Sequence, residues 1–178
     1  MALVGIIANP AASKDIRRLV AQGRVVPDWE KVNIVRRVML GLQSVGVTSV
    51  LGMADSSNLV RRASEDPTLS IDLDFVDMPA FYSEGDTVRA SGIMAERGVD
   101  CLVTLGGDGT NRAAVVGSKD IPMVAISTGT NNVFPTMVEG TLAGLAAGLV
   151  ADGKLPLVDV ALSSKVMNVY VDGELKDF

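Results

Sequence analysis

Three glycines lie within four positions around a single carboxylate in the segment from Gly106 to Asn111. Glycine permits positive φ angles and lets a phosphate approach the backbone without meeting a Cβ atom, so this composition is typical of a phosphate-binding turn. Asp108 is the exception, because a carboxylate beside a phosphate is repulsive unless it holds a metal ion or accepts a proton from a hydroxyl nucleophile. Both roles belong to phosphoryl transfer, in which positioning and charge neutralisation do most of the catalysis. The alternative is a tight turn in which Asp108 or Thr110 only caps the following helix.

A second polar segment, from Ser127 to Asn132, supplies hydroxyls, amides and one glycine that can bond phosphate, ribose or base edges. On its own it would be interpreted as a polar turn before a helix. Both segments follow a predicted strand, and the ends of parallel strands gather at one edge of the sheet, so we expect the two segments to flank one crevice. Asp108 is the catalytic candidate, and the candidates for binding nucleotide or phosphate are Asn9, Gly106, Gly107, Gly109, Thr110, Asn111, Thr128, Gly129, Thr130, Asn131 and Asn132.

A third element is Asn9-Pro10, which follows the first predicted strand and precedes a basic segment. Asn9 could bond a phosphate or a ribose, and Lys14, Arg17 and Arg18 could reach triphosphate oxygens. For the arginines, a solvated basic surface is the favoured alternative, because arginine is commonly exposed.

These segments need a scaffold, and short apolar runs alternate with helical stretches over residues 1–153. This alternation predicts an α/β fold with a Rossmann-like parallel sheet and helices on both faces. The expected strands cover residues 3–8, 48–53, 70–78, 101–105 and 123–126. The expected helices cover residues 29–45, 83–97, 110–116 and 135–151, with a short one that Asp55 or Ser56 caps and that ends at Ser64. We expect Gly117 to end the 110–116 helix. The 70–78 strand has one more polar face, so we expect it to lie at a sheet edge.

In the 29–45 helix, apolar residues recur at helical spacing and predict a buried stripe of Trp29, Val32, Val35, Met39 and Leu42. Lys31, Arg36 and Arg37 are expected to face water. The small residues of the 135–151 helix predict close packing against a neighbouring element.

After residue 153 the pattern changes. Residues 157–162 and 166–171 are predicted strands, and Asp172-Gly173 is a hairpin-turn signal. No helical crossover separates these strands, so they should be antiparallel. We interpret residues 154–178 as the first strands of a truncated β-rich second domain.

Composition excludes several classes of site. The sequence has no histidine, which rules out a Ser-His-Asp triad and a histidine-rich zinc site, and its one cysteine, Cys101, reads as a small core residue. A net charge of −5 argues against nucleic acid or anionic lipid as a partner. No apolar run approaches membrane-spanning length, so a cytoplasmic location is expected. Neither glycine segment matches the P-loop or the Rossmann Gly-x-Gly-x-x-Gly pattern.

The run from Gly106 to Thr110 resembles the hallmark of the superfamily that contains NAD kinases, diacylglycerol kinases, sphingosine kinases and phosphofructokinases. Asn9-Pro10 at the end of the first strand also resembles members of this superfamily, and the segments 127–135 and 139–141 are most similar to its ATP-NAD kinase-like branch named for the acetoin-catabolism protein X. The resemblance implies an N-terminal α/β domain, a C-terminal β-sandwich, and an active site between them. It also implies ATP and Mg²⁺ as cofactors, Asp108 acting at the acceptor hydroxyl or through Mg²⁺, and a homo-oligomer.

The leading hypothesis is a phosphotransferase that moves the γ-phosphate of ATP to a hydroxyl, with the 2′-hydroxyl of NAD as the first candidate acceptor. NAD kinases proper carry an Asn-Glu pair that binds the adenosine ribose of NAD, and no Asn-Glu dipeptide occurs in this sequence. Two alternatives therefore stay open. One is a nucleotide-binding regulatory protein without catalysis, and the other is a kinase of a lipid or another small-molecule alcohol.

Overall fold

The computed structural model describes residues 2–14, 20, 22–129 and 131–177. Its centre is a parallel sheet of five strands in the order β3-β2-β1-β4-β5. The strands are β1 (Leu3–Ala8), β2 (Ser49–Gly52), β3 (Asp72–Phe75), β4 (Cys101–Gly106) and β5 (Met123–Ser127). From β1 the chain builds outward to β3 and then crosses back to place β4 on the other side of β1. The loops that follow β1 and β4 therefore leave the sheet in opposite directions, which opens a crevice at their carboxyl ends.

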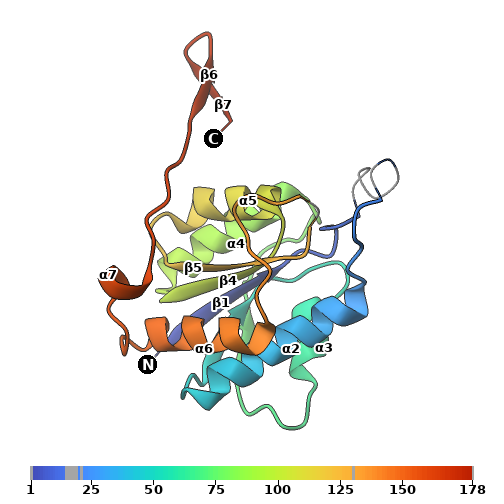
Figure 1. Cartoon of the computed structure of the whole chain (residues 1–178), viewed down its shortest axis with the longest axis vertical. Coiled ribbons are helices and arrows are strands. Elements are labelled where there is room, and N and C mark those ends of the chain that lie inside the picture. The colour runs from blue at the N-terminus through green and yellow to red at the C-terminus, as the bar shows by residue number, and fades with distance from the viewer. Residues whose placement is uncertain (1, 15–19, 21, 130, 178) are drawn as a thin grey trace.

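Two layers of helices cover the sheet (Figure 1). One face carries α2 (Asp28–Ser44), α3 (Leu59–Ser64) and α6 (Gly140–Ala151), and the other carries α4 (Glu84–Glu96) and α5 (Asp108–Ser118). Alternate residues of the strands enter the two cores, so Ile6 packs with α2 and α3 while Ile7 packs with α4. The predicted α/β architecture is confirmed, and β3 lies at a sheet edge as expected.

Helix α2 corrects two predictions. Val32, Val35, Met39 and Leu42 are buried as predicted, but Trp29, in the first turn of the helix, is 62% exposed. Lys31, expected in water, is completely buried. Its aliphatic stem is buried, and its ammonium donates hydrogen bonds to backbone carbonyls. The spacing of apolar residues does not predict a buried lysine of this kind.

The predicted 135–151 helix begins later than expected, at Gly140. Thr136 instead pairs with β5, where its N–H donates to the Ala125 carbonyl at 3.1 Å and its carbonyl accepts from the Ser127 N–H at 2.8 Å. The Glu139 carboxylate then accepts the N–H groups of Thr141 and Leu142 and caps the helix. The expected close packing of small residues is confirmed, because a Cβ atom at Gly144 would lie 2.1 Å from the Val38 carbonyl oxygen on α2.

Gly117 does not stop α5, which ends at Ser118. A Cβ atom at Gly117 would lie 2.2 Å from the Val88 carbonyl oxygen of α4. The glycine therefore serves the contact between two helices, which the sequence alone does not distinguish from a helix stop.

The C-terminal segment leaves the body of the domain as an arm (Figure 1). Residues 157–162 do not form the predicted strand. They contain the short helix α7 (Leu157–Val160), and within the described residues no strand pairs with them. The predicted hairpin does form, between the antiparallel strands β6 (Val169–Val171) and β7 (Glu174–Asp177). Its turn has φ angles of 52° at Asp172 and 79° at Gly173, which suit this residue pair. Among the helices that the structure describes, none combines the length and apolar character needed to cross a lipid bilayer.

Candidate functional site

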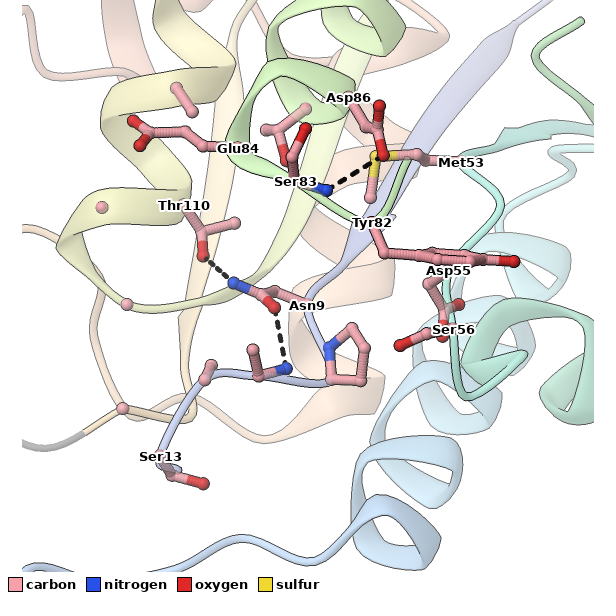
Figure 2. Close-up of a pocket in the computed structure, with 18 of the residues that line it drawn as sticks. Asn9, Ser13, Met53, Asp55, Ser56, Tyr82, Ser83, Glu84, Asp86 and Thr110 are labelled. Atoms are coloured by element: carbon pink, nitrogen blue, oxygen red, sulfur yellow. Dashed lines mark hydrogen bonds between the residues drawn. The ribbon is translucent and has the colours of Figure 1, made fainter. Parts of the chain in front are cut away.

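A cavity of roughly 400 Å³ opens at the carboxyl edge of the sheet, where the two predicted loops meet (Figure 2). The loops after β1, β2, β4 and β5 and the start of α4 form its walls. Of the residues predicted from sequence, seven line it: Asn9, Gly107, Asp108, Gly109, Thr110, Gly129 and Asn132. The two glycine-containing segments therefore face one crevice, as the sequence led us to expect.

Asn9 joins the two sides of the crevice. Its Nδ2 donates to Thr110 Oγ1 at 2.8 Å, and its Oδ1 accepts from the Ala11 N–H at 2.8 Å (Figure 2). Its own N–H donates to the Leu105 carbonyl at 2.9 Å. Asn9 thus fixes the start of the post-β1 loop against the first turn of α5.

Two glycines of the 106–109 segment, Gly106 and Gly107, are required for space and not for unusual φ angles. None of them is among the residues with positive φ, so that part of the expectation is wrong. A Cβ atom at Gly106 would lie 2.4 Å from Thr110 Oγ1, and one at Gly107 would lie 3.0 Å from Asn132 Oδ1. At Gly109 a Cβ atom would meet no atom within 4 Å, so its position is open toward incoming ligand.

Asp108 ties the two loops together. Its Oδ1 accepts the N–H groups of Val133 at 3.1 Å and Phe134 at 2.8 Å, and its Oδ2 accepts the Val133 N–H at 3.0 Å. In return, Asn132 Oδ1 accepts the Asp108 N–H at 3.4 Å. A carboxylate offers about four acceptor positions, so one on Oδ2 has no partner among the residues that the structure describes, and Asp108 is a residue that lines the cavity.

Four predicted residues are not among those that line the cavity: Gly106, Asn111, Thr128 and Asn131. Asn111 is buried, where it donates to the Gly107 carbonyl at 2.8 Å and accepts from Thr104 Oγ1 at 2.5 Å. The Thr128 N–H donates to the Gly106 carbonyl at 3.0 Å, which connects the ends of β4 and β5. Thr128 Oγ1 is buried and has no partner within the described part of the chain. Asn131 is exposed and has a φ of 54°, and Thr130 lies outside the described residues.

The cavity has a second lobe, which sequence reasoning missed. It is lined by Met53, Ala54, Asp55 and Ser56 after β2, and by Tyr82 to Glu84, Asp86 and Thr87 at the start of α4. The signal for Asp55 and Ser56 was present, because they follow a predicted strand just as Asn9 does, but they were interpreted only as helix caps. No pattern indicated Tyr82, which stands 68% exposed at a φ of 56°.

Asp55 does act as a cap. Its carboxylate accepts the N–H groups of Ser57 at 2.9 Å and Leu59 at 2.9 Å. Burial raises the pKa of Asp55 above 3.8, although these hydrogen bonds and one from the Val60 backbone act in the opposite direction. The second lobe therefore contains a carboxyl group, Asp55, whose pKa is raised by burial and lowered by its backbone hydrogen bonds.

Lys31 lies beneath the loop that follows β1. The sequence did not predict its contacts with this loop. Its Nζ donates to the carbonyls of Pro10 at 2.7 Å, Ala12 at 2.8 Å and Asn9 at 3.3 Å. Burial lowers the pKa of Lys31 to about 8. The side chain remains mostly protonated at neutral pH and contributes a positive charge behind the loop.

Lys14 does not line the cavity and is instead bound to Asp28, with Nζ 2.9 Å from Oδ1. Burial alone would raise the pKa of Asp28, but hydrogen bonds from Lys14 and Ser57 and the charges of Lys14 and Lys31 hold it below 3.8. Arg17 and Arg18 lie outside the described residues.

Within the described ranges, no three acidic or cysteine side chains cluster closely enough to form a metal cage. Mg²⁺ rarely requires one, because it usually retains water and binds one or two carboxylates together with substrate phosphates. Asp108 lines the cavity and has one acceptor position without a partner in the described ranges, so it is a carboxylate that fits that mode of binding.

A comparison with known families gives a match to the ATP-NAD kinase N-terminal domain over residues 4–154. The chain belongs to the ATP-NAD kinase family. It is 41% identical to the acetoin catabolism protein X of Cupriavidus necator over 177 residues, which is 95% of this chain and 49% of that protein. The chain thus spans about half the length of this curated relative.

Among solved structures, this family member is similar to the UDP-GlcNAc 2-epimerase from Neisseria meningitidis bound to UDP-GlcNAc. The TM-score is 0.43 at 13% identity, over 69% of this chain and 31% of that chain. A likeness at this level is remote.

Proposed function

We propose that the protein is an ATP-dependent phosphotransferase that moves the γ-phosphate of ATP to a hydroxyl, and that the 2′-hydroxyl of NAD is the first acceptor to test. The observation that carries this proposal is the position of Asp108. Asp108 lines the cavity together with Gly107 and Gly109, and one acceptor position on its Oδ2 is unused within the described part of the chain. A cytoplasmic location, expected from the sequence, and a homo-oligomeric state, implied by the resemblance, belong to the same proposal.

In this mechanism the phosphates of the nucleotide lie against the glycine segment and the N-terminus of α5. The helix N-terminus presents free N–H groups and a positive partial charge to anions. The open space at Gly109 lets a phosphate oxygen approach the backbone, and Gly129 and Asn132 face the same cavity from the other loop. Mg²⁺ held by phosphate oxygens would supply further charge neutralisation when bound, and Asp108 would be its protein ligand only in place of acting as the base, because a single acceptor position is open.

Asp108 Oδ2 is the atom that would accept the proton of the acceptor hydroxyl. The hydrogen bonds from Val133 and Phe134 fix the orientation of the carboxylate, so the open lone pair is held in one direction. The lobe lined by Tyr82 and Asp55 offers room for the nucleoside part of a ligand beside the phosphate site.

The test is Asp108→Asn in the full-length protein, with phosphate transfer from ATP to NAD as the readout. The substitution conserves shape and removes basicity, so we expect kcat to fall by about 10²–10⁴-fold with nucleotide binding retained. The matched control is Glu139→Gln, another carboxylate that accepts two backbone N–H groups at a helix start but does not line the cavity. Wild-type turnover in Asp108→Asn would refute the catalytic role.

A second candidate function is nucleotide binding without catalysis. It is favoured by the engagement of Asp108 with two backbone N–H groups, which is also what a purely structural aspartate would show. Calorimetric titration with ATP and ADP, followed by an assay for transfer to several acceptors, separates the two functions. Tight binding with no turnover on any acceptor would favour the regulatory protein.

The assay should compare several phosphate acceptors, because the substrate that receives the phosphate is the open question. The panel should contain NAD, a diacylglycerol and small-molecule alcohols. The relative is named for acetoin catabolism, and acetoin itself carries a hydroxyl group, so acetoin belongs in the panel.

A further inference from the structure

Lys31 is a buried cation whose three ammonium protons all point at one loop. The side chain is 0% exposed, and Nζ donates to the carbonyls of Asn9, Pro10 and Ala12. These residues form the start of the loop that leaves β1 and lines the cavity. An ammonium has three donors and no acceptor, so its hydrogen-bonding capacity is fully used here.

These contacts determine which side of the loop faces the cavity. In a trans peptide the C=O and N–H groups point in opposite directions. When the carbonyls of Pro10 and Ala12 turn toward Lys31, the N–H groups of Ala11 and Ser13 turn away from it. The Ala11 N–H is used by Asn9 Oδ1, while the Ser13 N–H has no partner in the part of the chain that the structure describes.

Ser13 also has a left-handed backbone conformation, with a φ of 67°, and its hydroxyl accepts the Val26 N–H at 3.1 Å. The N–H groups on either side of Ser13 are used inside the loop, because Ala12 donates to the Asn9 carbonyl at 3.4 Å and Lys14 donates to the Ala11 carbonyl at 3.1 Å. Among the described residues of this turn, the Ser13 N–H is therefore the donor left for an anion. Lys31, behind this turn, adds positive charge from the side opposite to the cavity.

The electrostatics explain why a cation can be buried there. An isolated buried ammonium is strongly unfavourable unless its protons are bonded and its charge is compensated. The loop carbonyls provide the bonds, and the carboxylates of Asp28, 3.9 Å away, and Asp55 favour the charge, whereas Lys14 opposes it. The loop and the lysine therefore depend on each other.

We propose that Lys31 is a positioning residue, which holds the carbonyls of Asn9, Pro10 and Ala12 beneath the loop so that the open Ser13 N–H, and no loop carbonyl, meets the phosphates of the nucleotide. This inference rests on the proposed nucleotide site. It adds a residue that touches no ligand and that acts through the loop.

The experiment compares Lys31→Met with Leu42→Ala in the full-length protein. Methionine keeps much of the side-chain volume but removes every donor. Leu42 is equally buried on the same helix and lies far along α2 from the loop, so its truncation destabilises the protein without touching the loop. We expect Lys31→Met to weaken ADP binding by about tenfold or more, since a misplaced loop loses charge-assisted hydrogen bonds to phosphate. We also expect a raised KM for ATP, with kcat changed less.

Hydrogen exchange of the amides of residues 11–14 gives a readout independent of ligand. Exchange should quicken in Lys31→Met and stay at the wild-type rate in Leu42→Ala. Wild-type ADP affinity and exchange in Lys31→Met would overturn the proposal, and so would an equal loss of affinity in Leu42→Ala. If Lys31→Met does not fold, Lys31→Gln, which keeps two donors without the charge, serves in its place under the same criteria.

The outcomes separate this inference from the proposed function. A wild-type protein that binds neither ADP nor ATP contradicts the proposed function. Exchange at residues 11–14 then decides the role of Lys31 by itself: a change confined to the Lys31 variant supports loop positioning, and no change overturns it.

Discussion

At the scale of single residues, the glycines of the 106–109 segment have different structural roles. Gly106 makes room for Thr110, Gly107 makes room for Asn132, and Gly109 faces open space. The motif therefore contains two glycines whose Cβ atoms would meet neighbouring side chains and one whose Cβ atom would meet none.

This difference predicts opposite effects of two alanine substitutions. Gly106→Ala should destabilise the protein by about 1–3 kcal/mol, because the new methyl group overlaps Thr110. Gly109→Ala should leave stability unchanged or raise it by up to about 1 kcal/mol, since alanine is the better helix former and no atom lies in its way.

If phosphate approaches the backbone at Gly109, the same Gly109→Ala variant should bind ADP about tenfold more weakly through loss of a charge-assisted hydrogen bond. Urea unfolding and calorimetric titration measure the two effects. A Gly109→Ala variant with wild-type affinity would contradict the placement of phosphate at this residue.

Lys31 gives a prediction for pH. Its pKa is about 8 in the folded state, against an ordinary value of 10.5, so below pH 8 the residue is charged in both states and the burial cost is fully present. Between pH 8 and 10.5 the folded form is neutral while the unfolded form still binds a proton, so the contribution to stability rises with pH. Wild type should gain up to about 3 kcal/mol relative to Lys31→Met across this range.

Urea unfolding of both proteins at several pH values measures this difference, and the comparison cancels the other titrating groups. A constant difference in unfolding free energy from pH 8 to 10.5 would mean that Lys31 titrates normally.

At the scale of elements, two helix pairs approach each other through glycine. Gly144 of α6 meets the backbone of α2, and Gly117 of α5 meets the backbone of α4. Because α2 also carries Lys31 and α5 carries Asp108 at its start, these contacts position both sides of the crevice.

The α2–α6 contact predicts that Gly144→Ala destabilises the protein by about 1–3 kcal/mol, because a backbone carbonyl 2.1 Å from the new atom can be relieved only by moving a helix. The matched control is Gly92→Ala within α4, where the nearest atom would lie 3.9 Å away. Thermal unfolding should show Gly144→Ala several degrees below wild type and Gly92→Ala at or above it. Equal melting temperatures for the two variants would show that the helices can separate at little cost.

At the scale of the whole molecule, the domain and the C-terminal arm differ in burial. None of the residues from Pro156 to Lys176 is buried, and several apolar side chains there are almost fully exposed, such as Leu162 at 98% and Val158 at 89%. We propose that residues 154–178 begin a β-rich second unit, in which these side chains would be covered. The greater length of the acetoin catabolism protein X supports this proposal.

Two outcomes are expected from that arrangement. A chain ending at residue 155 should keep the melting temperature of the 178-residue chain within a few degrees, since the removed residues contribute no core.

Limited proteolysis should cleave residues 156–168 rapidly in the 178-residue chain and slowly in the full-length protein. Rapid cleavage in both proteins would contradict a second unit that covers the arm.

The sequence by itself determined the local features of this protein. Apolar runs such as Leu3–Ala8 are typical of strands buried on both faces of a sheet. The glycine-rich and polar segments that follow successive strands must meet at one edge of a parallel sheet. The hairpin turn at Asp172-Gly173 was also predictable, because positive φ angles restrict the residues allowed there.

Tertiary structure alone decided what depends on partners distant in the chain. It turned Lys31 inward to the carbonyls of residues 9–12, directed Asp108 to the N–H groups of Val133 and Phe134, and gave Gly117 a neighbour on α4. Local periodicity reports which face of an element is apolar, but it does not report which polar atoms another element brings to that face. Only the assembled fold fixes those atoms, since a buried donor or acceptor is satisfied by whatever partner packing places within hydrogen-bond distance.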